Sequence, residues 1–412
     1  MQEIFIIGIG MTRFGRWPDS DVKSLTRMSV SEAIADAGIK LDAIEAAFFA
    51  NATQGHMEGQ DMIRGQIALR AMGIASIPVV NVENACASGA TAFQLAVASL
   101  KAEEYEIVLA IGAEKMLSND KGRTLSAFEG AWDVATQEAN QHRLLELGAG
   151  IQPPPGTVTE KPYSVFIDVY AAFARHHMWR YGTTQRQLAA VCAKNHGHSV
   201  HNSRAQFRRP YTIEEVLAAA PIAFPLTLPM CSPVSDGSAA VVLASAAGMK
   251  RLGIGAARAV RVLATVLQSG SDRRPDQPQL HCTVRAATRA YEAAGIGPAD
   301  VSVAEVHDAT AMGEIIQTEN LGFCPFGYGG PIAERRETSL GGRLPVNPSG
   351  GLESKGHPIG ASGLAQLHEL VLQLRVEAGA RQVQNARIGL AENGGGLIGI
   401  EEAAAVVTIL GK

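Results

Sequence analysis

An internal repeat restricts this chain of 412 residues to folds that contain two similar halves. Short segments recur in the same order, and the recurring pairs are residues 87–89 with 361–363 (ASG), 111–112 with 388–389 (IG) and 239–242 with 404–407 (AAVV). The first two pairs lie 274 and 277 residues apart, and the third only 165, as a large insertion in the first half requires. This order predicts a duplicated βα unit, whose equivalent strand-to-helix turns can meet at a pseudo-twofold interface.

Strands and helices alternate in both halves. Hydrophobic periodicity predicts strands at residues 3–10, 44–50, 77–80, 107–112, 238–243, 257–270, 301–306, 386–390 and 403–410. It predicts helices at residues 22–38, 61–73, 87–100, 282–295 and 361–377. Such alternation is typical of an α/β fold, and we expect a mainly parallel sheet.

The alternation stops between about residue 117 and residue 210. A proline run at 152–155 is followed by two expected helices, 163–181 and 184–198, with no strand between them. We interpret residues 118–210 as an inserted, mainly helical lobe. Residues 1–117 and 211–250 then form the N-terminal half, and residues 256–412 form the C-terminal half.

Composition and charge exclude several classes of function. Hydrophobic residues make up 46% of the chain and charged residues 18%, which is typical of a soluble globular protein. The net charge of −4 gives no reason to expect nucleic acid or an anionic membrane as a partner. The five cysteines are scattered without CxxC or Cys/His metal spacing, so neither disulfides nor a zinc site is expected. The first residues do not resemble a signal peptide, and no run is long enough to span a membrane, so we expect a cytoplasmic protein.

Cys86 lies in a short turn between an expected strand and an expected helix, within NVENACASGATAFQLAVASL at residues 81–100. Backbone N–H groups and the helix dipole at such a position favour a thiolate over a thiol. The alternative is a buried cysteine that packs as a small apolar side chain, and the turn alone favours neither interpretation.

His357 occupies the equivalent turn of the second half, within GGLESKGHPIGASG at residues 350–363. The glycines allow another segment to approach closely, and Pro358 fixes the backbone just after the histidine. A histidine held in this way suits a base that takes the proton of Cys86. Considered alone, the segment is a structural turn with an incidental histidine.

Two further strand ends carry polar residues. His307 ends an expected strand at the edge where α/β proteins bind ligands, and it could donate to a carbonyl oxygen or hold a water. In the ENGGG turn at residues 392–396, glycine amides could form an oxyanion hole with the N–H of Cys86, and Glu392 is a candidate base. A solvated strand end and an ordinary glycine turn are the respective alternatives.

Three histidines lie within residues 196–201, in the segment KNHGHSVH. Without a carboxylate or cysteine at ligand spacing, we interpret them as a polar surface of the inserted lobe and not as a metal site. The chain contains neither a GxGxxG fingerprint nor a GxxxxGK[ST] loop, so dinucleotide and phosphate-loop chemistry is not expected.

Taken together, these segments resemble the thiolase family over essentially the whole chain. The matching segments are NACASG around Cys86, GHPIGASG around His357, VSDGSAAVVLAS from Val234 and ENGGG at Glu392. HDA at His307, where the commonest thiolases have an Asn-Glu pair, resembles the sterol-carrier-protein type of thiolase, an acetyl-CoA acetyltransferase-like branch. KNHGHSVHN and PLTLPMCSPVSDG support the same branch.

The resemblance implies a five-layered α-β-α-β-α fold of two βαβαβαββ halves with an inserted loop lobe that helps to bind coenzyme A. It implies an acyl-CoA C-acyltransferase of lipid metabolism that condenses or thiolytically cleaves 3-ketoacyl-CoA. Cys86 would be the acylated nucleophile and His357 its activator. His307 with His357 would form one oxyanion hole, and the amides of Cys86 and Gly394 the other.

The resemblance also implies that coenzyme A and its thioesters are the substrates and that no metal or redox cofactor is needed. Family members are homodimers or tetramers, and some relatives of this branch pair with a small OB-fold protein. The large side chains Phe166, Tyr170, Phe173, Met178 and Trp179 lie at helical spacing. We therefore interpret them as core of the lobe and not as an acyl pocket.

One departure from the family decides the reaction type. Most thiolases have a second cysteine in a CxG turn, whereas this chain has Glu392-Asn-Gly394, and no other cysteine is a plausible substitute by position. A carboxylate can take an α-proton if an apolar site raises its pKa, so we hypothesise that Glu392 is the base. The alternatives are a retro-aldolase acting on a β-hydroxyacyl-CoA and a non-catalytic acyl-CoA or lipid binder.

Overall fold

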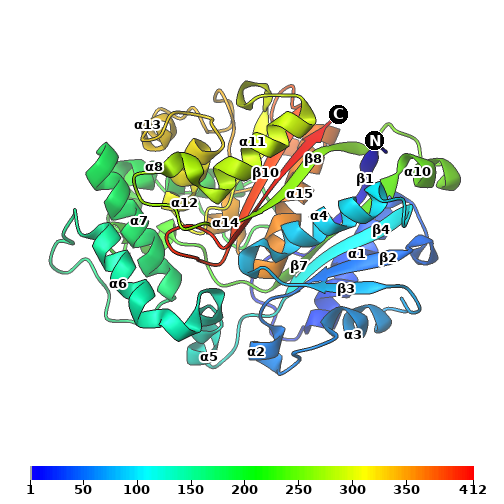
Figure 1. Ribbon diagram of the computed structural model, residues 1–412, viewed down its shortest axis with the longest axis horizontal. Coiled ribbons are helices and arrows are strands. Elements are labelled where there is room, and N and C mark those ends of the chain that lie inside the picture. Colours follow the sequence, from blue (N-terminus) through cyan, green and yellow to red (C-terminus); the bar gives the residue numbers. More distant parts are fainter. Residues whose placement is uncertain (1) are drawn as a thin grey trace.

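A computed structural model describes residues 2–412, and its centre is one nine-stranded sheet (Figure 1). The strands are β1 (Ile4–Met11), β2 (Ala46–Ala50), β3 (Val79–Val82), β4 (Ile107–Glu114), β7 (Gly237–Ser245), β8 (Val260–Ser269), β9 (Val303–Glu305), β10 (Ile388–Gly395) and β11 (Ala404–Gly411). β5 (Pro221–Ala223) and β6 (Leu226–Thr227) form a separate small hairpin.

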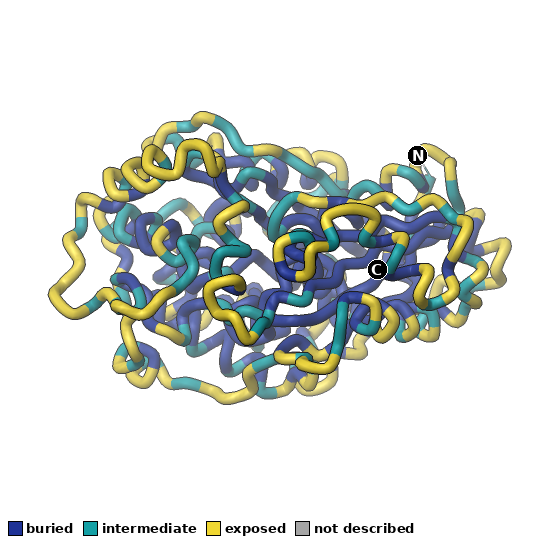
Figure 2. The backbone as a smooth tube through the Cα atoms, turned by 90° about the horizontal axis from the view of Figure 1, so that it is seen from below, coloured by how far each residue is buried: buried dark blue, intermediate teal, exposed yellow. Residues whose placement is uncertain are grey.

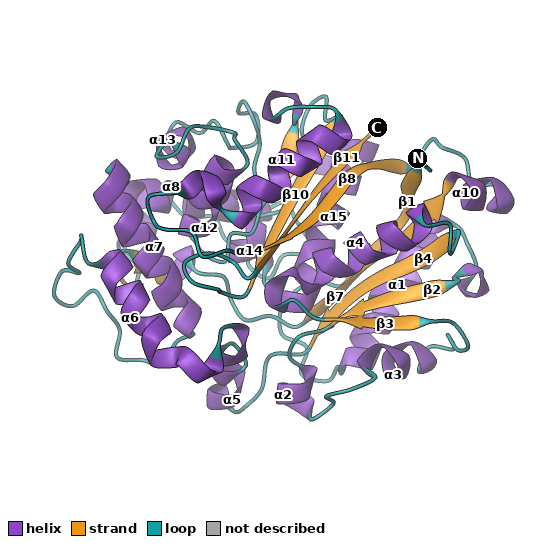
Figure 3. Cartoon of the chain, viewed as in Figure 1, coloured by secondary structure: helices purple, strands orange, loops and turns teal. Residues whose placement is uncertain are grey.

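Helices flank this sheet and form a lobe at one end of it (Figure 3). The helices are α1 (Val22–Ala37), α2 (Gln54–Glu58), α3 (Arg64–Arg70), α4 (Ser88–Lys101), α5 (Lys121–Ser126), α6 (Gln137–Gly148), α7 (Val165–Tyr181), α8 (Gln185–Ser199), α9 (Ile213–Leu217), α10 (Ala246–Leu252), α11 (Cys282–Ala294), α12 (Ala311–Asn320), α13 (Gly329–Glu334), α14 (Gly351–Lys355) and α15 (Ile359–Arg375). Among residues 2–412, no helix has the length and apolar content that a membrane crossing requires.

The sheet is mixed, and the expectation of a mainly parallel sheet is wrong. Its strand order is β3-β2-β4-β7-β1-β8-β11-β10-β9. The outer pairs β2–β3, β2–β4 and β9–β10 are parallel, while the central pairs are antiparallel. β7 and β11 cause the difference, because each lies antiparallel to the strand before it in its half and so reverses the direction of the sheet.

The two halves have the same strand order from the centre outward, which confirms the duplication. β1, β7, β4 and β2 of the first half correspond to β8, β11, β10 and β9 of the second. The ladders align Ala239 with Ala404, and they align the strand partners of these residues, Gly112 and Gly395. The match of residues 111–112 with 388–389 is therefore out of register. A shared dipeptide occurs too often by chance to define the register of two strands.

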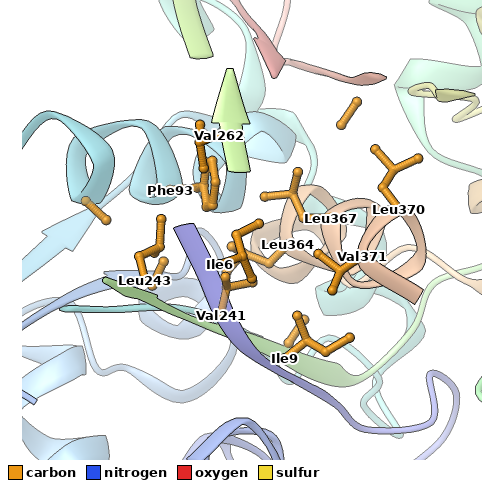
Figure 4. Close-up of a cluster of buried hydrophobic side chains, with 14 of the residues drawn as sticks. Ile6, Ile9, Phe93, Val241, Leu243, Val262, Leu364, Leu367, Leu370 and Val371 are labelled. Atoms are coloured by element: carbon orange, nitrogen blue, oxygen red, sulfur yellow. The ribbon is translucent and has the colours of Figure 1, made fainter. Parts of the chain in front are cut away.

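The structure has five layers, with helices on both outer faces and between the two parts of the sheet. Three buried clusters lie between these layers. One cluster lies between the two parts of the sheet and contains the facing helices α4 and α15, with Phe93, Leu364 and Val371 (Figure 4). A second cluster packs α1 against the other face of the first half, and a third packs α11 against the other face of the second half. The strands consequently lie in the buried interior, with exposed residues mainly on loops and outer helices (Figure 2).

The helical lobe is larger than the expected segment 118–210. Its buried core joins Tyr170 and Leu188 of the insertion with Met230 and, from α12 of the second half, Met312 and Ile315. Helices α7, α8, α9, α12 and α13 therefore form one packed unit at the end of the sheet where β4 and β10 terminate.

Candidate active site

Cys86 occupies a tight one-turn helix between β3 and α4. Its neighbour Ala85 has a φ of 47°, a left-handed conformation that is unfavourable for a residue with a side chain. The N–H of Ala87 closes the turn by donating to the carbonyl of Asn84 at 2.9 Å. Strand β10 lies directly against this turn, because a Cβ added to Gly395 would overlap the backbone of Ala87 and Asn84. The second half therefore holds the cysteine turn of the first in place.

Cys86 and His357 converge, as the pseudo-twofold arrangement predicted, and His307 joins them from the end of β9. The Sγ atom of Cys86 and one ring nitrogen of each histidine all lie within 4.8 Å of one another. The two imidazole rings are 5.2 Å apart between centroids and nearly perpendicular, at 79°. Both histidines are buried, whereas Cys86 is partly exposed. This cluster has the geometry of a nucleophile beside a base.

Hydrogen bonds define the tautomer of His357. Ser362 Oγ donates to the carbonyl of Pro358 at 3.0 Å, so its oxygen accepts from Nδ1 of His357 at 2.7 Å. The ring hydrogen is then on Nδ1, and Nε2 keeps a free lone pair. Burial and the neighbouring His307 lower the pKa of His357 well below 6.5, so the ring is neutral. His357 can therefore accept the thiol proton of Cys86.

His307 has the opposite tautomer. The side-chain amide of Asn393 donates to Nδ1 of His307 at 3.1 Å, which leaves the ring hydrogen on Nε2. Burial lowers the pKa of this histidine to about 4. His307 is thus a neutral donor beside the nucleophile, which suits it to bind a carbonyl oxygen on which negative charge develops.

The surroundings of Cys86 favour the thiol, which is opposite in direction to the thiolate expected from the turn alone. Burial and the negative charge of Glu114 raise its pKa to about 12. The N–H groups of Gly396 and of Cys86 itself lower the pKa, but desolvation outweighs them. Gly394 lines the neighbouring cavity, whereas the glycine amide that faces the sulfur is that of Gly396.

Glu392 does not have the position expected of a base. Its Oε2 accepts the backbone N–H of His307 at 3.0 Å, and its Oε1 is buried without a hydrogen-bond partner among residues 2–412. Burial and the nearby charge of Glu402 raise its pKa well above 4.5, which favours the protonated carboxyl. The Glu392 side chain is hydrogen-bonded to the backbone of His307. Within the described residues, the cavity lining includes Gly394 but not Glu392.

Cys86 and both histidines line a cavity of about 660 Å³ between the sheet and the lobe. Its wall is rich in aromatic side chains, namely Phe128, Tyr163, Phe166, Tyr170, Phe207 and Tyr211. The assignment of the lobe's large side chains to core was therefore incomplete for Phe166 and Tyr170, which pack in the core and also line the cavity. Trp179, with 61% of its surface exposed, does not belong to the core.

The histidines of the lobe are largely buried, contrary to the expected polar surface. His196 also lines the cavity, and its Nδ1 lies 3.2 Å from Ser354 Oγ. His198 accepts the N–H of Leu340 at 3.0 Å, and burial lowers its pKa to about 3. These rings connect the insertion to the second half, which the sequence could not reveal because their partners lie more than 140 residues away.

Three important residues escaped the sequence analysis. Ser362 and Asn393 set the tautomers of the two histidines, and Glu402 lines the cavity with a carboxylate. A signal for Glu402 was present, because Glu401 and Glu402 directly precede a strand that is otherwise apolar. Two acids at the start of a buried strand need buried partners, and this requirement could have singled them out.

The whole chain is similar to thiolases. It matches the family model "Thiolase, N-terminal domain" over residues 4–247 and "Thiolase C-terminal domain-like" over residues 266–412. An acetyl-CoA acetyltransferase of Methanothermobacter thermautotrophicus is 37% identical over 402 residues, which cover 96% of this chain and 97% of that protein. Sterol carrier protein 2 of Oryctolagus cuniculus is 34% identical, with 99% of this chain and 72% of that protein covered.

Two further proteins are similar over nearly their full length. The benzoylsuccinyl-CoA thiolase subunit BbsB of Thauera aromatica is 33% identical, covering 93% of this chain and 92% of that protein. The solved structure titled "Ltp2-ChsH2(DUF35) aldolase" superposes with a TM-score of 0.78 at 22% identity, covering 99% of this chain and 97% of that one. At that identity, the superposition establishes a shared fold.

Proposed function

Because this chain belongs to the thiolase family and is a homologue of acetyl-CoA acetyltransferase, we propose that it is an acyl-CoA C-acyltransferase with a covalent Cys86 intermediate. The observation that carries the proposal is the convergence of the Cys86 sulfur and the two imidazole rings within 4.8 Å at the wall of a deep cavity. A packing cysteine would need neither a neutral base nor an aligned donor beside it.

Acylation starts from a neutral pair. Nε2 of His357 takes the proton of Cys86 as the sulfur attacks the carbonyl carbon of an acyl-CoA. Before the reaction, both Cys86 and His357 are uncharged, so no ion pair is buried in the apolar site. The raised pKa of Cys86 and the lowered pKa of His357 agree with this neutral state. The thiolate of coenzyme A then leaves and recovers the proton from His357. The proton count therefore closes without a metal or redox cofactor.

Two sets of donors would hold the developing oxyanions. The N–H groups of Cys86 and Gly396 already face the sulfur, so they are placed for the carbonyl oxygen of an acyl group on Cys86. We assign to Gly396 the role expected of Gly394. Nε2–H of His307 would hold the oxygen of the second thioester, whose α-carbon becomes the carbon nucleophile.

The cavity favours a bulky acyl group. Six aromatic side chains line a volume of about 660 Å³, far more than an acetyl group fills. Aromatic walls contribute dispersion and edge-to-face contacts that a ring system or branched chain uses best. The similar protein from Thauera aromatica is named for an aromatic acyl-CoA, which agrees with this assignment.

Intact-mass measurement tests the proposed function. The protein is incubated with acetyl-, octanoyl- and benzoyl-CoA, and each adduct is measured over time. We expect adducts of the corresponding acyl masses, with octanoyl and benzoyl adducts forming at least about tenfold faster than the acetyl adduct, since each buried methylene is worth about 0.8 kcal/mol. The Cys86→Ser variant should form none, whereas Cys324→Ser, which changes a cysteine outside the cavity lining, should react normally.

The absence of an adduct with every acyl-CoA would contradict the transferase. Cleavage of a β-hydroxyacyl-CoA that survives in Cys86→Ser would then identify the retro-aldolase, because that reaction needs no acylated cysteine. Binding of acyl-CoA without either reaction would identify the non-catalytic binder.

We also propose that the chain forms a homodimer. β3 is an edge strand of the sheet, and its Val80 leaves 43% of its surface exposed. Met62 and Ile63, which are 76% and 57% exposed, lie nearby in the chain before α3. Unpaired edge strands with apolar side chains pair readily with a second chain. A small OB-fold partner stays a prediction. It is favoured by the Thauera aromatica protein, which is named as a subunit, and by the similar solved structure, whose title names two components.

A further inference from the structure

A carboxylate that the sequence analysis did not consider lies in the active-site cavity. Glu402, in the connection between β10 and β11, lines the cavity together with Cys86, His307 and His357. A Cβ added to Gly394 would lie 2.7 Å from Cγ of Glu402. Gly394 and Glu392 are two residues apart on β10, so their side-chain directions are the same. The Glu402 side chain therefore lies on the same face of β10 as position 392, where most thiolases have their second cysteine.

We infer that Glu402 accepts the α-proton of the second acyl-CoA in the proposed carbon–carbon bond-forming step. The inference rests on the proposed function, and it replaces Glu392 in that role. Two neighbours hold the carboxylate: Nε2 of Gln317 donates to Oε1 at 2.8 Å, and Nε2 of His281 lies 3.1 Å from Oε2.

Both neighbours are themselves fixed. Gln317 accepts from the side-chain amide of Asn320 at 3.1 Å, which orients its own N–H₂ group toward Glu402. His281 caps α11, where its Nδ1 accepts the N–H of Thr283 at 3.1 Å and its hydrogen is left on Nε2. Oε1 accepts one hydrogen bond and retains a lone pair, while Oε2 also accepts a long hydrogen bond of 3.9 Å from the Cys282 thiol. The carboxylate is thus oriented and can still accept a proton.

The electrostatics of the two adjacent carboxyl groups separate their roles. Burial raises the pKa of Glu402, but His281 and hydrogen bonds outweigh it and bring the pKa to about 2. The pKa of Glu392 is raised, partly by the charge of Glu402. The surroundings therefore favour the anion at Glu402 and the neutral acid at Glu392. The lowered pKa keeps Glu402 ionised but makes it a weak base, so proton transfer to it depends on stabilisation of the forming enolate by Nε2–H of His307.

Two other acidic groups of the cavity wall have raised pKa values. Among the lining residues that the structure describes, Glu353 also carries a carboxyl group, but burial and Asp308 raise its pKa well above 4.5. Burial and Glu353 likewise raise the pKa of the Cys231 thiol, which lines the same cavity. These shifts favour the protonated form of both groups, whereas the shift at Glu402 favours the anion.

The step balances with groups already on the chain. The C–H bond at the α-carbon breaks, its proton goes to Glu402, and its electron pair forms an enolate whose oxygen accepts from Nε2–H of His307. The enolate carbon attacks the acyl carbonyl on Cys86, so a C–C bond forms and the C–S bond breaks. The departing Cys86 thiolate recovers the proton that Glu402 had accepted, which returns both groups to their starting states.

Isotope exchange tests the inference separately from the proposed function. An α-deuterated acyl-CoA is incubated with Glu402→Gln, and loss of deuterium is compared with acyl-adduct formation on Cys86. We expect exchange to fall about 100-fold, the usual contribution of a general base, while the adduct forms within about twofold of the wild-type rate. Glu402→Asp should recover part of the exchange.

Glu319→Gln is the matched control. Glu319 pairs with His177 at 3.0 Å, as Glu402 does with His281, but it lies outside the lining of the active-site cavity. This variant should exchange deuterium at the wild-type rate. Wild-type exchange in Glu402→Gln would overturn the inference, as would equal loss of exchange and acylation. Exchange lost only in Glu392→Gln would restore Glu392 as the base. Failure of the wild-type protein to form any adduct would instead reject the proposed function and the inference with it.

Discussion

Single hydrogen bonds decide where the protons of the site reside. His307 and His357 are both buried and neutral, yet they present different faces to Cys86. Ser362 accepts from one ring and Asn393 donates to the other, so one histidine offers a lone pair and its neighbour offers a hydrogen. Two identical side chains therefore suit the different roles proposed for them, base and donor, because their partners differ.

Ser362→Ala should slow acylation of Cys86 by about tenfold. The variant removes the hydrogen bond from Nδ1–H of His357 to Ser362 Oγ, which favours the tautomer with a free lone pair on Nε2. Ser99→Ala is the matched control, since Ser99 makes a comparable helical hydrogen bond to the carbonyl of Ala96 at 2.9 Å, far from the site in α4. Stopped-time intact-mass measurements give both rates. An unchanged rate in Ser362→Ala would contradict the tautomer assignment.

The pH dependence of acylation should report the lowered pKa of His357. A histidine acts as a base in its neutral form, and a lowered pKa extends that form to lower pH. Adduct formation in the wild-type protein should therefore remain constant as the pH falls through 6.5, the ordinary value for histidine. A half-maximal rate near pH 6.5 would show that the base titrates as an exposed histidine does.

Contacts between glycine and backbone join the two halves in a symmetric way. Gly112 of β4 faces the carbonyl of Gly360 at the start of α15, and its equivalent Gly395 of β10 faces the turn of Cys86. Gly360 and Cys86 are separated by 274 residues, the offset of the repeat. Each half thus packs one strand against the helix start of the other, and only glycine permits this approach.

Gly395→Ala should destabilise the protein by about 1–3 kcal/mol and also slow acylation, because the added methyl group displaces the backbone of Ala87. Gly112→Ala should destabilise it similarly. Gly197→Ala is the control, because its Cβ would meet open space on α8, and a helical alanine should stabilise by about 0.5–1 kcal/mol. Chemical denaturation measures all three. Equal stability in the three variants would mean that the halves are not tightly joined.

In the whole molecule, the edge of the sheet at β3 is open, and the site is enclosed where the helical lobe covers the ends of the strands. β3 ends the strand order on one side, while the helical lobe covers the end where β4 and β10 terminate (Figure 1). The lobe supplies the aromatic wall of the cavity, and the two halves supply the reactive groups. Acyl selectivity and chemistry are therefore carried by different parts of the chain.

Val80→Lys should convert a homodimer into a monomer, because a charged side chain on an exposed edge strand opposes pairing with a second copy. Light scattering coupled to size exclusion measures the mass. Lys101→Glu, an exposed charge change at the end of α4, is the control and should leave the mass unchanged. A wild-type monomer would contradict the proposed dimer, and a tetramer would show that a second surface also takes part.

The sequence alone indicated the duplication, most of the strands and helices, and the meeting of Cys86 with His357, because these depend on local periodicity and on the offset of the repeat. It did not indicate strand direction, the raised pKa of Cys86 or the burial of Glu392, because each depends on which segments pack together in the folded chain. Glu402 illustrates the difference: its presence is visible in the sequence, but its charge depends on His281 and Gln317. Desolvation and hydrogen-bond partners determine the reactivity of a buried side chain, and only the tertiary structure brings those partners together.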